Sequence, residues 1–140
     1  MKSILASALF LVLAAPAVAG EAVTVYRAPG CGCCDVYADY LRENGFEVTV
    51  IDDPAFDRRS IEAGVPANGL GCHLAMIDGY AVSGLVPVNV IERLLEERPA
   101  ITGITLSGMP VGAPGMPGTK AGPLKVFAFG EDGVSLYAEE

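Results

Sequence analysis

Residues 22–51 read AVTVYRAPGCGCCDVYADYLRENGFEVTVI, and this stretch decides the fold that the sequence predicts. Ala22 to Ala28 alternates and is rich in β-branched residues, which is typical of a strand, and Pro29-Gly30 ends it. Asp35 to Asn44 has apolar residues at helical spacing, and Phe46 to Ile51 has the composition of a second strand. The stretch therefore predicts a β-α-β unit with a right-handed crossover and two parallel strands.

Four further elements follow toward the C-terminus, and their periodicity and turn residues indicate each of them. They are a short helix that Asp53-Pro54 opens and that ends near Gly64, strands at His73 to Ile77 and Tyr80 to Ser83 joined by Asp78-Gly79, and a helix from Val88 to Arg98. The order β-α-β-α-β-β-α is that of a thioredoxin or glutaredoxin core. We therefore predict an α/β, thioredoxin-like fold.

The two predicted longer helices each have one apolar face. In the first, Val36, Tyr37, Tyr40 and Leu41 lie on the buried side, and Gly45 caps the end. In the second, the inward residues are Ile91, Leu94 and Leu95, and Pro99 ends the helix.

Residues 101–123 read ITGITLSGMPVGAPGMPGTKAGP and form a Gly-, Pro- and Met-rich C-terminal extension. We expect a long, ordered or semi-ordered loop here, and the alternative is a disordered linker. A hairpin is predicted to follow, with strands from Leu124 to Phe129 and from Val134 to Ala138. Because the chain returns to structure there, a pure linker is the weaker interpretation.

The first 19 residues, MKSILASALFLVLAAPAVA, have the features of a secretory signal peptide. Lys2 supplies the charged start, Ile4 to Ala15 is apolar, and Ala17-Val18-Ala19 has the small-x-small pattern of a cleavage site. The alternative is a membrane anchor, but the apolar run is short for a bilayer. We therefore expect cleavage after Ala19 and one exported, periplasmic domain at residues 20–140, with no membrane attachment.

The formal net charge of the chain is −8, and loss of Lys2 with the signal peptide takes it to −9. An acidic surface argues against nucleic acid and anionic lipid as partners.

Three of the four cysteines lie in the stretch Cys31-Gly32-Cys33-Cys34, where the first strand passes into the first helix. A C-x-x-C pair at a helix start has a lowered thiol pKa, which favours both disulfide exchange and metal binding. Cys33 adds a third sulfur that a redox pair does not need. Converging thiolates select Cu(I), Zn or iron–sulfur clusters, so we expect a metal site. The alternative is that Cys33 is a buried small hydrophobe.

Four more residues are candidate metal ligands. In a thioredoxin-like core, the loop before the third strand lies against the helix start, so Cys72 and the adjacent His73 are expected near the other cysteines. Because neighbouring strand residues point oppositely, both reach the site only if one of them lies in the loop. Met109 and Met116 carry thioethers, which suit Cu(I). The alternatives are an ordinary surface or core histidine and methionines that fill gaps.

Three stretches carry a resemblance to a known family: CGCCDVYADYLRENGFEV, GVPANGLGCHLAMIDGYAVSGLVPVNVIERLLEERP and GMPVGAPGM. Together they span nearly all of residues 23–118, and they resemble the periplasmic copper-resistance proteins of the CopG type. The resemblance implies a thioredoxin-like fold, a role in copper handling with copper redox interconversion, and a cysteine-bridged copper cluster. The matching positions are Cys31, Cys33, Cys34, Cys72, His73, Met109 and Met116. Two departures are Tyr37, where the family usually has Trp, and Leu85, where it often has His.

Copper binding in copper tolerance is therefore the leading interpretation, with copper ions and other periplasmic copper-handling proteins as partners and a copper-dependent oxidoreductase activity left open. The first alternative is a metal-free thiol–disulfide oxidoreductase that uses Cys31 and Cys34. The second is a structural domain with two inert disulfides, for example Cys31–Cys34 and Cys33–Cys72.

Overall fold

The computed structural model describes residues 20–140, and one mixed β-sheet runs through this part of the chain. The predicted signal peptide, residues 1–19, lies outside the described residues. The sheet has seven strands in the order β2-β1-β3-β4-β5-β6-β7. The strands are β1 (Ala22–Arg27), β2 (Glu47–Asp52), β3 (His73–Ile77), β4 (Tyr80–Ser83), β5 (Gly103–Thr105), β6 (Lys125–Gly130) and β7 (Gly133–Glu139). The helices are α1 (Gly32–Glu43), α2 (Phe56–Glu62) and α3 (Val88–Glu97), with a 3-10 turn η1 at Ala67–Gly69.

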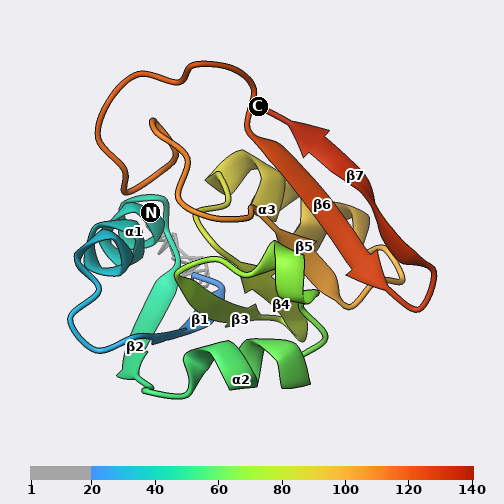
Figure 1. Cartoon of the computed structure of the whole chain (residues 1–140), viewed down its shortest axis with the longest axis horizontal. Coiled ribbons are helices and arrows are strands. Elements are labelled where there is room, and N and C mark those ends of the chain that lie inside the picture. The colour runs from blue at the N-terminus through green and yellow to red at the C-terminus, as the bar shows by residue number, and fades with distance from the viewer. Residues whose placement is uncertain (1–19) are drawn as a thin grey trace, which may run out of the picture.

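The first seven strands and α-helices along the chain follow the predicted order β1-α1-β2-α2-β3-β4-α3, which confirms the α/β prediction (Figure 1). β1 pairs in parallel with β2, and β3 pairs antiparallel with both β1 and β4. The parallel pair requires a crossover, and α1 supplies it. As a result, the start of α1 and the start of β3 lie at the same end of the central strands.

The helices divide between the two faces of the sheet. α1 and α3 cover one face and α2 covers the other (Figure 1). The larger core cluster lies under α1 and α3, where Tyr37, Leu41, Ile91 and Leu94 pack against alternate strand residues such as Val25. A smaller core cluster lies on the α2 side and consists of Val65, Leu74, Ala81 and Phe129. The period-2 alternation of the strands thus supplies both faces with apolar side chains.

The predicted hairpin is present as β6 and β7, but a strand that was not predicted joins it to the sheet. β5 lies inside the stretch 101–123, for which we expected only a loop, and it pairs in parallel with β4 and antiparallel with β6. Its register places Gly103 opposite Ala81. A Cβ at Gly103 would lie 1.9 Å from the Ala81 carbonyl oxygen, so the pairing requires glycine there.

Two helix predictions need correction. α1 begins at Gly32, three residues before the predicted Asp35, and Val36 is 55% exposed although it was placed on the buried face. Ala38 is buried instead, because the wider apolar stripe of α1 faces the sheet. The second helix begins at Phe56 and not at Pro54. The Asp53 carboxylate accepts the Ala55 N–H at 2.9 Å, which closes a turn ahead of the helix.

Candidate metal centre

The start of α1 positions three cysteines by its backbone geometry. Cys31 is the N-cap residue and has an extended conformation, so Cys33 and Cys34 fall in the first helical turn. The Cys31 carbonyl oxygen accepts the N–H groups of Cys34 and Asp35 at 3.2 and 3.3 Å. The unpaired N–H groups and the dipole of this helix end favour negative charge on the adjacent sulfurs.

The fourth cysteine comes from the loop that enters β3. The pairing of β1 with β3 places His73 opposite Arg27, so the preceding residue, Cys72, lies beside the end of β1 where α1 begins. The Sγ atoms of Cys31, Cys33, Cys34 and Cys72 all lie within 4.8 Å of one another. Four sulfurs this close form a soft-ligand centre.

Two of the four sulfurs are bonded to each other. Cys31 and Cys34 form a disulfide, whereas Cys33 and Cys72 are free thiols. The Cys33 Sγ lies 3.4 Å from the Cys31 Sγ and 3.6 Å from the Cys72 Sγ. The pairing Cys31–Cys34 is one of the two disulfides in the inert-framework alternative, and the other, Cys33–Cys72, is not formed.

The environment of Cys72 favours its neutral thiol when no metal is bound. Burial raises the pKa of the Cys72 thiol, the nearby Cys33 sulfur adds to the effect, and the pKa reaches about 12. A cation that binds this sulfur must therefore displace a proton, and the positive charge of that cation offsets the cost of a buried thiolate.

His73 is the first residue of β3, so Cys72 lies in the loop, as the alternation argument required. Its side chain is fully buried, and its ring centre lies 4.7 Å from that of Tyr37. The Nδ1 atom lies 3.4 Å from the Cys72 Sγ, and Nε2 has no hydrogen-bond partner among residues 20–140. Burial lowers the pKa of His73 to about 4, so the ring is neutral at physiological pH.

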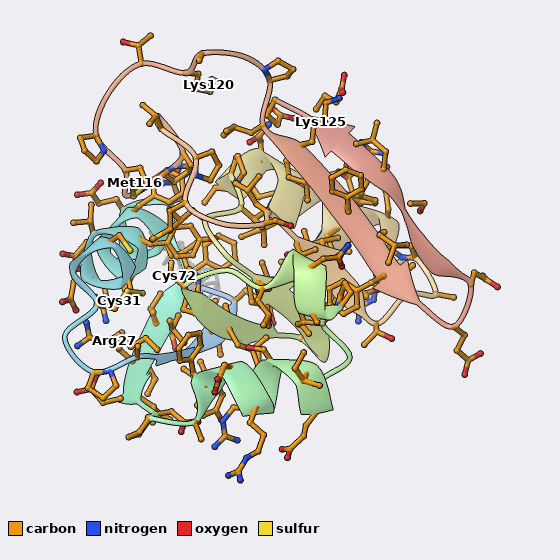
Figure 2. The ribbon with its side chains drawn as sticks, viewed as in Figure 1. Arg27, Cys31, Cys72, Met116, Lys120 and Lys125 are labelled. Carbon is orange, nitrogen blue, oxygen red and sulfur yellow. A yellow bond between two sulfur atoms is a disulfide. The ribbon has the colours of Figure 1, made fainter. Side chains whose placement is uncertain are left out.

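The two candidate methionines differ in their surroundings. The Met109 Sδ lies 3.8 Å from the Cys33 Sγ, and its side chain is 54% exposed. Met116 is partly buried and packs against the larger core cluster. Figure 2 shows Met116 beside α1. Residues 108–116, which we call the methionine loop, thus bring only one thioether to a sulfur contact.

Gly115 allows the methionine loop to approach α1 closely. Its φ is +91°, and a Cβ there would lie 2.8 Å from the Cys33 carbonyl oxygen and 3.4 Å from the Tyr37 nitrogen. Glycine is the residue that fits both the left-handed backbone and the contact. The loop is therefore packed onto the cysteine-bearing turn.

Comparisons with known proteins show which family and which solved structures the chain is similar to. A family model described as "Protein of unknown function, DUF411" matches residues 70–116. The solved structure titled "Copper resistance protein copG- Form 2" matches with a TM-score of 0.80 and 36% identity, over 86% of this chain and 98% of that chain. The chain belongs to the CopG family. A second CopG structure, "Form 1", matches with a TM-score of 0.79 at the same identity and coverage. No curated protein matches the chain.

The family model covers only part of the sulfur centre of this chain. Residues 70–116 include Cys72, His73 and both methionines of the loop, whereas the three cysteines of α1 precede them. The solved CopG structures match over nearly the whole described fold, so both halves of the centre fall within the CopG match. Leu85 is fully buried in the larger core cluster, against which Cys72 also packs.

Arg27 holds the start of α1 in place, and the sequence reasoning did not identify it. Its guanidinium pairs with Asp35 at 2.7 Å and with Asp52 at 2.9 Å, and it donates to the Cys31 carbonyl oxygen at 3.1 Å. These contacts connect β1, β2 and the first turn of α1. Figure 2 shows Arg27 near Cys31. The sequence feature that could have indicated this role is the position of Arg27, a charged residue at the end of an apolar strand and four residues before Cys31.

The described part of the chain contains no helix with the length and apolar character that crossing a membrane requires.

Proposed function

We propose that this protein binds copper, as Cu(I), on the sulfurs of Cys31, Cys33, Cys34 and Cys72 and acts in copper tolerance. The observation that carries the proposal is the mutual distance of these sulfurs, all within 4.8 Å. The two solved relatives titled copper resistance proteins support copper as the metal.

The donor set supports Cu(I) over harder cations. Thiolate and thioether sulfurs are soft ligands, and Met109 brings a thioether to within 3.8 Å of the Cys33 sulfur. Zinc is satisfied by Cys and His ligands and needs no thioether. His73 and Met116 are assigned supporting positions at the edge of the centre, where His73 contacts Cys72 and Met116 helps to pack the methionine loop.

Because Cys31 and Cys34 form a disulfide, copper loading on all four sulfurs requires reduction of that bond first. The proposal therefore includes a redox role in which thiol state and copper occupancy are linked. We also place the protein in the periplasm, with copper ions and other copper-handling proteins of that compartment as partners.

A second candidate function is a metal-free thiol–disulfide oxidoreductase. The Cys31–Cys34 disulfide at the N-terminus of α1 favours it, because this is where a helix end promotes thiolate chemistry. The two candidates differ in what they require of Cys33. An exchange reaction needs one attacking thiolate and one resolving thiol, whereas a copper cluster uses every bridging sulfur.

The deciding experiment is elemental analysis of the full chain and its Cys33→Ser variant, each produced in copper-fed cells. We expect copper in the parent protein and loss of most of it in Cys33→Ser, since a hydroxyl is a poor Cu(I) ligand. Val36→Ser is the matched control, because Val36 is exposed on the same helix and is not a proposed ligand. Circular dichroism checks the fold. Full copper loading of a well-folded Cys33→Ser protein would leave the oxidoreductase as the better candidate.

A further inference from the structure

The sulfurs of the centre fall into two groups when the Cys31–Cys34 disulfide is formed. The disulfide removes Cys31 and Cys34 as thiolates. Three sulfurs remain, and Cys33 is in the middle of them: its Sγ lies 3.6 Å from the Cys72 Sγ and 3.8 Å from the Met109 Sδ.

The distances from the Cys33 sulfur to the other two sulfurs are those expected when such sulfurs share a single soft ion. Three sulfurs each at about 2.3 Å from one metal in a trigonal arrangement lie about 4 Å apart. The two distances from Cys33 are close to that value. Two thiolates and one thioether select Cu(I) among the common metals.

We infer that the disulfide form of this protein keeps a smaller Cu(I) site made of Cys33, Cys72 and Met109. The inference rests on the proposed copper function and deepens it. The state of the Cys31–Cys34 pair then sets how much copper the protein holds, and oxidation reduces the capacity without emptying the centre.

The three ligands of the smaller site come from three different elements. Cys33 lies in the first turn of α1, Cys72 in the loop before β3, and Met109 in the methionine loop. β-sheet pairing places Cys72, and the contact of Gly115 with the Cys33 carbonyl places the loop. Neither placement depends on Cys31 or Cys34 being reduced.

The smaller site is also reachable. Cys33 and Cys72 are only partly buried, and the Met109 side chain is 54% exposed. An ion carried by a partner or a chelator can therefore meet Met109 first and then the two thiols. Thioether contact at the surface with thiolates below it favours transfer inward, because thiolate is the stronger ligand.

The change between the two forms balances with an external dithiol reductant. The dithiol breaks the Cys31–Cys34 bond, each sulfur receives one electron and one proton, and the reductant becomes a disulfide. The reverse step needs an external disulfide that accepts the two electrons and two protons. Copper keeps its Cu(I) state throughout, so no redox change of the metal is required.

The test compares Cu(I) titrations of the oxidised and the dithiol-reduced full chain, without oxygen and against a chromophoric Cu(I) chelator. Mass spectrometry after thiol alkylation confirms two free thiols in one form and four in the other. We expect the oxidised form to bind about one Cu(I) per chain and the reduced form to bind more. X-ray absorption of the oxidised complex should show sulfur as the nearest neighbour.

Variants identify the ligands. In the oxidised form, Cys33→Ser and Cys72→Ser should abolish binding, and Met109→Leu should weaken it by about tenfold or more. Val111→Ser is the matched control, because Val111 lies on the same loop, is 55% exposed and is not a proposed ligand. It should leave the Cu(I) affinity of the oxidised form unchanged. Circular dichroism again checks that each variant is folded.

Each outcome has a separate meaning. If the oxidised form binds no Cu(I) while the reduced form does, the smaller site is absent and the proposed copper function stands. If neither form binds Cu(I), the proposed function itself fails. If the oxidised form binds Cu(I) equally well in Cys33→Ser and Met109→Leu, the ion sits elsewhere and the inference is overturned.

Discussion

Burial of the His73 ring has a cost in folding free energy. A fully buried imidazole whose Nε2 has no partner among the described residues loses a hydrogen bond to water without replacing it. Its ring nevertheless packs against Tyr37, whose hydroxyl donates to the Val86 carbonyl at 2.8 Å, and its Nδ1 contacts Cys72. The residue thus connects the core under α1 to the sulfur centre.

Burial of His73 predicts a pH dependence of stability in the metal-free chain. Its pKa falls from 6.5 to about 4, so between these values the unfolded state binds a proton that the folded state does not. The contribution is complete above pH 6.5 and is lost as the pH falls toward 4, at about 1.4 kcal/mol per pH unit. Urea unfolding at a series of pH values measures it.

His73→Phe is the comparison variant, because phenylalanine fills a similar volume and does not titrate. The difference in unfolding free energy between parent and variant should change with pH only through this window, since His73 is the chain's single histidine. A constant difference would show that the ring titrates in the folded protein as it does in the unfolded chain, and so is not shielded from water.

At the residue scale, chemistry-bearing residues were predictable where they are clustered along the chain, and less so where contacts come from distant segments. The C-x-C-C spacing and Cys72 pointed to one centre, and the structure brings all four sulfurs together. The sequence did not distinguish Met109 from Met116, because which one reaches Cys33 depends on how a glycine-rich loop folds onto α1.

At the scale of elements, the methionine loop is the part that links α1 to the C-terminal half of the chain. Its close approach depends on Gly115, whose φ is +91° and which has no room for a Cβ against the Cys33 carbonyl. Gly115→Ala should therefore displace the loop and move Met109 away from Cys33, with Cu(I) affinity reduced by about tenfold. Competition with a Cu(I) chelator measures the change.

Gly122→Ala is the control for this prediction. Gly122 follows the loop in the chain, a Cβ there meets no atom within 4 Å, and its φ is not in the left-handed region. The substitution should leave Cu(I) affinity unchanged. Equal affinities for both variants would mean that the loop position does not set the affinity.

The order of elements was predictable because long, periodic segments dominate it, while short segments escaped. β5 has only three residues, and periodicity cannot be recognised over that length. Its place is determined by pairing with β4 and β6, which are tertiary contacts. The start of α1 was predicted three residues late for a different reason. Glycine and cysteine are weak helix formers, and the geometry of the site decides where the helix begins.

At the scale of the whole molecule, the centre exists because the topology brings three distant segments together. These segments are the first turn of α1, the loop before β3 and the methionine loop. Cys72, in the loop before β3, follows Cys34 by 38 residues, and Met109, in the methionine loop, follows Cys33 by 76 residues. The order of strands and helices allowed the contact between the α1 turn and the loop before β3 to be predicted from the sequence. The contact between α1 and the methionine loop could not be predicted, because the methionine loop follows β5, a strand that the sequence did not reveal.

Export is the remaining whole-molecule prediction, and the redox chemistry of the centre depends on it. An oxidising compartment allows the Cys31–Cys34 disulfide to persist, whereas cytosolic reductants keep such pairs as thiols. We expect the protein in the periplasmic fraction to begin at Gly20, and intact-mass analysis measures this. Ala19→Arg should block cleavage, while Val18→Gln, at the unconstrained middle position of the small-x-small pattern, should not. A soluble cytoplasmic protein that keeps Met1 would contradict export, and with it a disulfide form that persists in the cell.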